Sequence, residues 1–289
     1  MRRSALLLMS GLALIWGSNF LWMKLGVRAM SAEELTLSRF LLGAAVLFPL
    51  VALRGERLPR GWKTWTHITV AALFANAAPY LLFALAEEHV ASSTAAILNA
   101  TTPLWTVLIA LAVRHGPPVR PPLVAGLLVG FGGTLLIFSP WQHASDIASA
   151  GGLECLAAAV CYGISYVYMD RYLANGPVRP VTLAACQLLV SALLLAVAVA
   201  ATGFTAMRLT GVAVGSVLVL GVVGTGIAYL LAYVIITREG ATVASTVTYL
   251  NPIVAIILGV AVLSETITAP VLAGIALVLA GQALTRYRP

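Results

Sequence analysis

The chain has 289 residues, of which 61% are hydrophobic and only 9% are charged. Soluble domains contain about half apolar and about a quarter charged residues, so this composition excludes a soluble globular protein and indicates an integral membrane protein. The formal net charge of +7 would suit a nucleic-acid partner. We expect none, because the basic residues stand between apolar runs, as they do when they orient a membrane protein.

Ten apolar segments are long enough, or nearly so, to cross a bilayer as helices, which takes about 20 residues. The connections are short and β-barrel alternation is absent. The sequence therefore predicts an all-α membrane protein with ten transmembrane helices and no soluble domain. The predicted spans are residues 4–23, 33–53, 66–86, 91–113, 121–138, 150–170, 180–202, 211–236, 241–263 and 269–286.

Lysine and arginine residues predict that both the N and the C terminus are cytoplasmic. With the N-terminus inside, thirteen of these residues fall on the cytoplasmic side and three, Lys24, Arg28 and Arg208, fall outside. Such an excess of positive charge marks the cytoplasmic side of a membrane protein. We expect a multi-pass protein of a bacterial-type inner (plasma) membrane.

The two halves of the chain repeat one pattern. Trp16 in the first span matches Tyr162 in the sixth at an offset of 146 residues, and Pro103 in the fourth matches Pro252 in the ninth at 149. Matches in the same order at similar offsets favour an internal duplication. Because each copy has five spans, the second is inverted, an architecture typical of secondary transporters. The predicted repeats are residues 1–140 and 141–289.

Several segments resemble the EamA-type branch of the drug/metabolite transporter superfamily. They are "WGSNFLWMK", "SRF", "ASSTAAILNATTPLWTVLIALAV", "GATVASTVTYLNPIVAIILGVAVLSETIT" and "AGIALVLAGQ". The resemblance covers nearly the whole chain. It implies a ten-helix exporter with a central cavity, which moves amino acids or related small metabolites and is often driven by the proton gradient. That family often ends the fourth span of both repeats with Gly-Glu, whereas here Glu265 has only Gly116 as its counterpart.

Polar and aromatic residues within the spans are candidates for the wall of a substrate cavity. Trp16 and Asn19 share one helix face, as do Tyr162 and Tyr166. An aromatic plane beside an amide would orient a zwitterion; the alternative is helix packing, with Asn19 bonded to a neighbouring helix. The candidate substrate-binding residues are Trp16, Asn19, Asn76, Tyr80, Asn99, Trp105, Tyr162, Tyr166, Tyr229, Tyr249 and Asn251.

Two prolines interrupt the fourth and ninth spans. Pro103 and Pro252 each free a carbonyl group one turn earlier in the helix. Interrupted helices near the midplane are a good sequence indication of a transporter's binding site. The alternative is a simple kink in which threonine hydroxyls satisfy the free carbonyls.

Arg39 is the only basic residue well inside a span. Charged residues in the membrane are costly and are usually paired or functional. Arg39 is expected either to contact an anion in the outward path or to form a structural ion pair with Glu87 or Glu88, at the outer end of the third span.

Glycine pairs with GxxxG spacing allow tight helix contact, within the chain or in a homodimer, and we leave both alternatives open. They are Gly126/Gly130 and Gly211/Gly215.

The sequence predicts a secondary transporter that exports amino acids or related small metabolites by alternating access. Neither a cofactor nor a metal site is expected, since the three cysteines lie in apolar runs without metal-binding spacing. A carrier of lipid-linked or nucleotide-sugar metabolites is the nearest alternative, although nucleotide sugars would require more deep basic residues than Arg39. An intramembrane enzyme is disfavoured because HExxH and Gly-x-Ser-x-Gly motifs are absent.

No carboxylate stands at a predicted midplane position, so exchange and facilitated diffusion remain alternatives to proton coupling.

Overall fold

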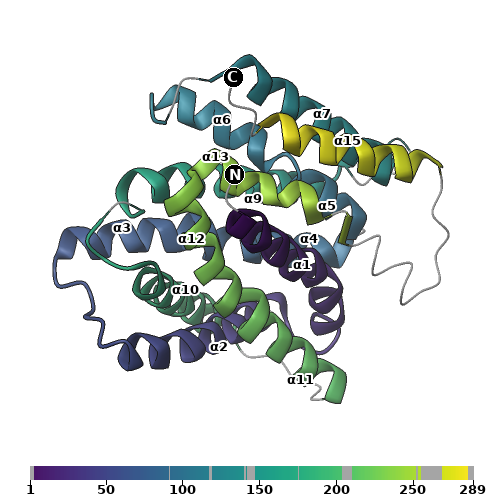
Figure 1. The fold of residues 1–289 in the computed structure, drawn as a ribbon. Coiled ribbons are helices and arrows are strands. Elements are labelled where there is room, and N and C mark those ends of the chain that lie inside the picture. The colour runs from purple at the N-terminus through teal and green to yellow at the C-terminus, as the bar shows by residue number, and fades with distance from the viewer. Residues whose placement is uncertain are drawn as a thin grey trace.

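The structure is a computed structural model that describes residues 3–90, 92–116, 119–139, 141, 147–174, 176–203, 210–251, 253–254 and 269–285. These residues form helices and turns, and none of them lies in a strand. Figure 1 shows the helices packed in layers, with α7 and α15 together at one edge and α2 and α11 at the opposite edge.

The first half of the chain contains α1 (Arg3–Gly26), α2 (Ala32–Leu53), α3 (Trp62–Ala72), the π-helical turn η1 (Leu73–Ala77), α4 (Ala78–His89), α5 (Ser92–Asn99), α6 (Thr102–Ala112) and α7 (Pro121–Phe138). The second half contains α9 (Ala150–Tyr172), α10 (Pro180–Thr202), α11 (Gly211–Leu218), the π-helical segment η3 (Val219–Ile227), α12 (Ala228–Glu239), α13 (Ala241–Ser245), the 3₁₀ turn η4 (Thr246–Leu250) and α15 (Ala269–Thr285).

Seven helical segments in the described part of the chain are long and apolar enough to cross a membrane. They are Leu6–Gly26, Ala32–Leu53, Trp62–His89, Thr94–Ala112, Ala150–Tyr172, Pro180–Ala201 and Gly211–Glu239. Two shorter apolar helices, Pro121–Ile137 and Ala269–Thr285, stand where the fifth and tenth spans are predicted. The predicted ninth span lies partly outside the described residues. The protein is thus an all-helical multi-pass membrane protein, while the count of ten remains a prediction.

Helix starts are defined by local side-chain chemistry. Ser31 and Glu34 form a reciprocal capping box at the start of α2, in which each side chain accepts from the other residue's backbone N–H. Ser149 and Thr210 cap α9 and α11 through their hydroxyl oxygens. Pro180 opens α10, where its missing N–H is not needed.

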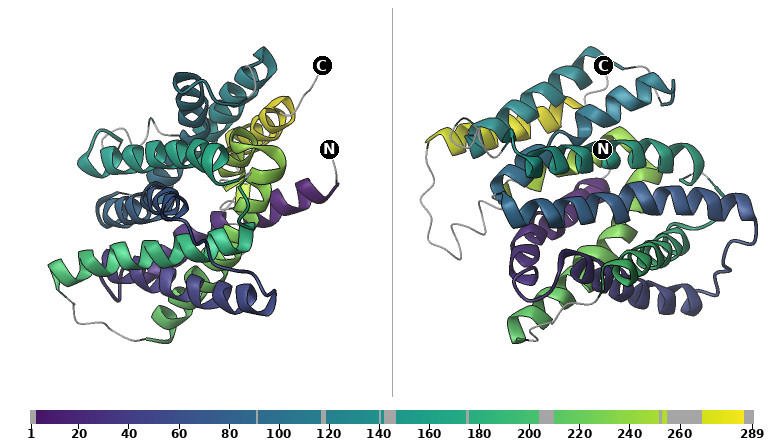
Figure 2. Two further views of the ribbon diagram at one scale, coloured as in Figure 1. Left: turned by 90° about the vertical axis from the view of Figure 1, so that its left-hand side faces the viewer. Right: turned by 180° about the vertical axis from the view of Figure 1, so that it is seen from behind.

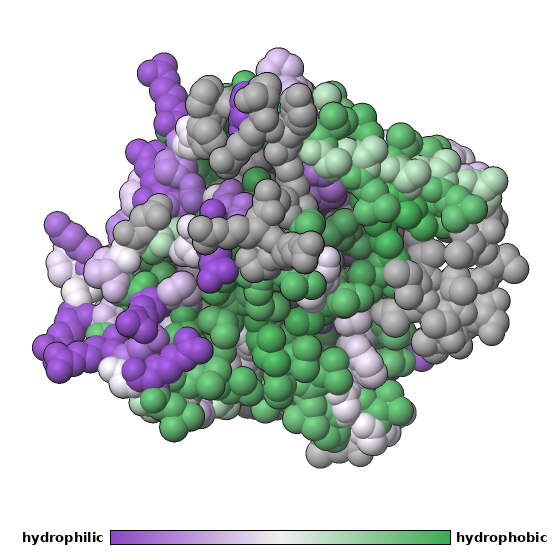
Figure 3. Space-filling model, in the orientation of Figure 1, coloured by the Kyte–Doolittle hydropathy of each residue, from purple (hydrophilic) through white to green (hydrophobic). Residues whose placement is uncertain are grey.

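The outer surface has the polarity expected of a protein in lipid. Hydrophobic residues cover the broad central part of the face in Figure 3, and hydrophilic residues gather along its left-hand edge. At that edge Figure 1 places the connection between α2 and α3, which carries the exposed residues Arg54, Arg57 and Arg60; exposed Lys63 follows in the first turn of α3. Positive charge thus clusters at this end of the helices, and the orientation in the membrane stays a prediction.

Helices from the two halves pack against one another, as α2 with α10, α4 with α9 and α7 with α15. The closest of these contacts joins α7 and α15, which lie side by side in all three ribbon views (Figures 1 and 2). A Cβ on Gly126 would lie 2.7 Å from the carbonyl oxygen of Gly281, and one on Gly133 would lie 2.6 Å from that of Gly274. Only glycine allows this approach. The crossed pairing makes the two helices antiparallel.

The second glycine pair has a different environment. A Cβ on Gly211 or Gly215 would meet no described atom within 4 Å. The Gly126 face is therefore used within the chain, whereas Gly211 and Gly215 make no close contact with the described residues, although α11 also packs against α1 and α2. A homodimer through α11 remains a hypothesis.

The third span of each half contains a π-helical segment, η1 between α3 and α4 and η3 between α11 and α12. Such segments occur frequently at functional sites, because the wider turn breaks the regular backbone hydrogen bonding. Ala75 of η1 lines the cavity described below, and Thr225 of η3 contacts Arg39.

Candidate functional site

A cavity lies between helices of both halves. Its free space is about 730 Å³, open solvent at its mouth included. The structure brings nine of the residues predicted from sequence to its wall: Trp16, Asn19, Arg39, Tyr80, Asn99, Tyr162, Tyr166, Tyr229 and Asn251.

Apolar side chains complete the wall. Met23, Phe83 and Met169 line the cavity and were not among the predicted residues. An apolar side chain within a transmembrane segment carries no sequence signal that separates a cavity wall from a lipid or core contact. The rings of Phe83 and Tyr162 are stacked, with centroids 6.0 Å apart.

Asn76 lies outside the cavity, in a buried network between η1 and α10. Its Nδ2 donates to Ser191 Oγ at 2.7 Å, and its Oδ1 accepts from Gln187 Nε2 at 3.4 Å. Tyr233 donates to the Oε1 of Gln187. Gln187 lies 148 residues after Arg39, an offset similar to those of the other repeat matches, and here it joins α10 to η1 and to α12.

Trp105 and Tyr249 also lie outside the cavity. Trp105 Nε1 donates to Thr101 Oγ1 at 3.1 Å, and its Cβ would lie 2.7 Å from a Cβ on Gly163. Tyr249 is fully buried and donates to the carbonyl oxygen of Leu127 at 3.1 Å. Both are packing residues in this structure.

The fourth span of the first half is interrupted beside the cavity. α5 ends at Asn99, the chain turns through Ala100 and Thr101, and α6 begins at Thr102 with Pro103 next. In the second half the α-helix gives way to the 3₁₀ turn η4 before Asn251. Pro252 lies outside the described residues. Asn99, directly before the first of these interruptions, and Asn251, directly after η4, both line the cavity.

Arg39 is 2% exposed and lies in the cavity wall. Its Nε donates to Thr225 Oγ1 at 3.3 Å, and its Cζ lies 4.4 Å from the centroid of the Tyr80 ring, a cation–π contact. Of the two alternatives for Arg39, the ion pair is not seen as a direct contact: among the described residues no salt bridge joins Arg39 to Glu87 or Glu88. An aromatic face and a hydroxyl take the place of the carboxylate.

Asn19 both packs and lines the cavity. Its Nδ2 lies 3.4 Å from the carbonyl oxygen of Gly224, so it connects α1 to η3. Next to it, a Cβ on Gly17 would lie 3.0 Å from the carbonyl oxygen of Asn251, so α1 passes close to the chain directly after η4. Asn19 therefore packs against η3 and also lines the cavity.

Four lining residues have buried polar atoms for which the described chain supplies no hydrogen-bond partner. The atoms are Trp16 Nε1, Arg39 Nη2, Asn19 Oδ1 and Asn251 Oδ1. The first two are donors and the last two are acceptors. A buried polar group without a partner costs about 1–3 kcal/mol, so a ligand that supplies complementary groups would relieve this cost.

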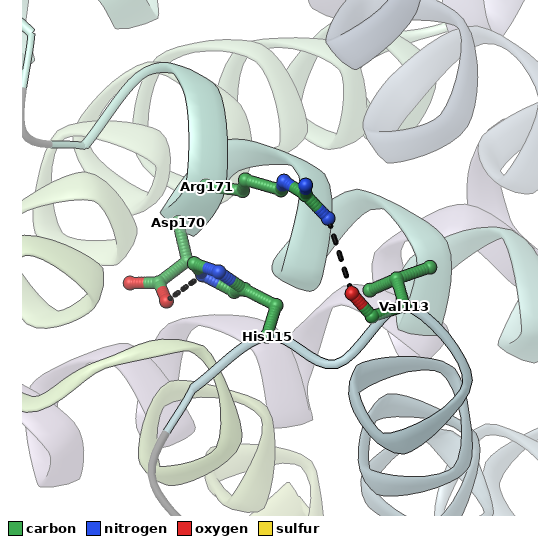
Figure 4. A network of polar contacts seen from close by, with 4 residues as sticks. All are labelled: Val113, His115, Asp170 and Arg171. Atoms are coloured by element: carbon green, nitrogen blue, oxygen red, sulfur yellow. Dashed lines mark hydrogen bonds and ion pairs between the residues drawn. The ribbon is translucent and has the colours of Figure 1, made fainter.

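At the end of the molecule predicted to be cytoplasmic, polar contacts join α6 to α9 (Figure 4). His115 Nε2 lies 2.9 Å from Asp170 Oδ2, and Arg171 Nη1 donates to the carbonyl oxygen of Val113 at 3.2 Å. The pair joins the end of a first-half helix to the end of a second-half helix, and it is partly exposed.

The EamA-like transporter family model matches residues 3–139 and again residues 150–287. The chain belongs to the EamA-like transporter family. This confirms the family predicted from the sequence motifs, and it makes the protein a membrane transporter by descent.

Relatives of this EamA-like transporter are themselves named as transporters. An uncharacterized transporter of Archaeoglobus fulgidus is 24% identical over 270 residues, which cover 92% of each chain. The uncharacterized inner membrane transporter YedA of Escherichia coli is 25% identical over 269 residues, which cover 89% of this chain and 82% of YedA. A probable terminal-alkyne amino-acid exporter of Streptantibioticus cattleyicolor is 29% identical over 160 residues, or 55% of this chain and 52% of the exporter.

A solved crystal structure to which this EamA-like transporter is similar shares its fold. The two align with a TM-score of 0.80 at 24% identity, and the alignment covers 99% of this chain and 98% of the other.

Proposed function

We propose that this protein is a secondary transporter that exports amino acids or related small metabolites across the inner membrane by alternating access through the cavity. The observation that carries the proposal is the set of four unpartnered polar atoms in the cavity wall, two donors and two acceptors. A zwitterion has an acceptor carboxylate and a donor ammonium, and it would supply partners for both kinds.

Each pole of such a substrate has a matching group. The carboxylate would accept hydrogen bonds from Arg39 Nη2 and Trp16 Nε1, and the ammonium would donate to Asn19 Oδ1 and Asn251 Oδ1. Hydrogen bonds to charged groups contribute about 1.5–3 kcal/mol each. The remaining aromatic wall suits an apolar or aromatic side chain.

Alternating access is supported by the relation between the halves. The family model matches each half separately, and α7 and α15 pack antiparallel through glycines at matched positions, Gly126 with Gly281 and Gly133 with Gly274. Two inverted repeats, residues 1–140 and 141–289, would exchange roles between outward-open and inward-open states.

Carriers of polyanionic solutes are the weaker alternative. Arg39 is the single charged residue among the described residues that line the cavity. A nucleotide sugar carries several negative charges, and one guanidinium in a medium of low dielectric constant would leave most of them unbalanced. The distant amino-acid exporter among the relatives favours the zwitterion, although its match covers only 55% of this chain.

The test is exchange of labelled amino acids across proteoliposomes that contain the purified protein. We expect saturable exchange for at least one amino acid and its loss in Trp16→Ala. Trp62→Ala is the matched control, because that tryptophan is 74% exposed and outside the cavity. Folded protein that exchanges no amino acid, or a Trp16→Ala variant with normal exchange, would overturn the proposal.

A further inference from the structure

A buried carboxylate lies one helical turn beyond the cavity. Glu87 is 1% exposed, and neither of its carboxylate oxygens has a hydrogen-bond partner in the described chain. Phe83, four residues earlier on α4, lines the cavity. An ionised carboxylate without hydrogen bonds is costly to bury, whereas its protonated form is much less so. The location and the missing partners indicate a group that takes up and releases a proton.

The charged and titratable groups around Glu87 come from three other helices. Lys24 at the end of α1 donates from Nζ to the Glu87 backbone carbonyl at 3.1 Å, not to its carboxylate. Arg39 on α2 and Lys24 both interact electrostatically with the Glu87 carboxyl. On α9, Cys155 lies within electrostatic reach of Glu87 and Glu154. The other packed segments, η1 and α5, contain no titratable residue.

The position of Glu87 also gives it a route to water. The next residues on α4, Glu88 and His89, are exposed at the end of the helix that is predicted to face outward. Across the helix interface, Glu154 has a buried Oε2 without a described partner. The exposed end of α4 thus begins one residue after Glu87 in the chain, although the Glu87 side chain itself is enclosed.

We infer that Glu87 is the site at which this transporter binds its coupling proton, an inference that rests on the transport function proposed above. The proton moves from water on one side onto a Glu87 oxygen and returns to water on the other side, with no covalent bond to substrate. Arg39 lines the cavity and acts on Glu87 through space, without a salt bridge between them among the described contacts. Gain or loss of the proton changes the potential at the substrate site, which is the energetic coupling that a driven carrier requires.

The experiment compares Glu87→Gln with Glu88→Gln, a matched pair of adjacent residues of which one is buried and the other exposed. In proteoliposomes, the wild type and Glu88→Gln are expected to accumulate labelled amino acid when a pH gradient is imposed. Glu87→Gln should show no accumulation, and its exchange rate should lose the pH dependence of the wild type. Exchange above background shows that the variant is folded. Gradient-driven accumulation by Glu87→Gln would overturn the inference, as would a sodium gradient that drives the wild type at uniform pH.

A second measurement needs no substrate. Infrared difference spectra of the protein in lipid, between acid and alkaline pH, should contain the carbonyl band of a protonated carboxyl group in an apolar site. The band should be lost in Glu87→Gln and kept in Glu88→Gln. Its persistence in Glu87→Gln would overturn the inference. If the wild type exchanges no amino acid but shows a Glu87-dependent band, the proposed substrate class fails while the proton site stands.

Discussion

The guanidinium of Arg39 lies 4.4 Å from the centroid of the Tyr80 ring, and Nη2 of the same group has no hydrogen-bond partner in the described chain. The Tyr80 ring in turn meets Tyr162 edge-on, with centroids 6.2 Å apart. The positive charge of the cavity thus lies on the face of a first-half tyrosine, whose ring contacts a tyrosine of the second half. No carboxylate of the described residues forms a salt bridge with Arg39, so the proposed substrate carboxylate would have this charge as its partner.

Replacing Arg39 by lysine should weaken substrate binding although the positive charge is kept. Lysine is a point charge without the planar fork that reaches Thr225 and a ligand carboxylate together. Loss of one charge-assisted hydrogen bond, about 1.5–3 kcal/mol, corresponds to a roughly 10- to 100-fold higher dissociation constant. Saturation of exchange measures this change. Arg28→Lys, in an exposed position, is the control, and an unchanged constant in Arg39→Lys would argue against an anion contact.

Asn76→Ala should lower the stability of the protein, whereas Asn251→Ala should lower its affinity for substrate. Asn76→Ala removes a fully buried partner of Ser191 and Gln187, which should lower the free energy of unfolding by about 1–3 kcal/mol and leave affinity unchanged. Asn251→Ala removes an unpartnered acceptor in the cavity wall, so affinity should fall with little loss of stability. Thermal unfolding in detergent and the exchange constant separate the two. A loss of affinity in Asn76→Ala without destabilisation would contradict this prediction and indicate that Asn76 contacts the substrate.

Gly163→Ala should destabilise the contact between α6 and α9. The new Cβ would lie 2.7 Å from Trp105 Cβ and 3.1 Å from the Thr106 backbone nitrogen, and backbone cannot move aside as a flexible side chain can. Overpacking of this kind costs about 1–3 kcal/mol. Gly132→Ala, where a Cβ meets no described atom within 4 Å, should instead stabilise α7 by up to about 1 kcal/mol. Thermal unfolding that shifts in the same direction in both variants would contradict this prediction.

Asp170→Asn should change stability much less than Gly163→Ala, although both act on the same pair of helices. The side chains of His115 and Asp170 are 27% and 19% exposed, so water and salt screen their interaction. Exposed ion pairs contribute about 0–1 kcal/mol. Unfolding of the variant and the wild type at low and high salt tests this. A loss as large as that of Gly163→Ala would mean that the pair is a principal link between α6 and α9.

The burial of Glu87 could not be predicted from the sequence. By sequence it stands at the end of the third span, beside Glu88, and no carboxylate stood out as a proton site. In the structure the two neighbours differ completely in exposure, because α4 packs against α9 on the side that carries Glu87. Helical rotation places adjacent residues about 100° apart, so only the packing partner decides which one is enclosed.

The same limit explains why three of the predicted site residues lie outside the cavity. Nine predicted residues meet at the cavity, yet Asn76, Trp105 and Tyr249 pack elsewhere. In a soluble protein an amphipathic stripe shows which face of a helix is buried. A membrane helix is apolar on its lipid face and on its packed face alike, so its sequence lacks that marker.

Sequence alone determined the membrane class, most of the helical segments and the transporter family, because hydrophobic length and family motifs are properties of short continuous stretches. The tertiary structure decided which polar groups face the cavity, that Arg39 rests on Tyr80 and not on a glutamate, and that α7 and α15 are joined through glycine. These outcomes depend on how helices far apart in the chain rotate and pack against one another. The face that each helix buries is decided by the helices that pack against it, and these come from distant parts of the chain.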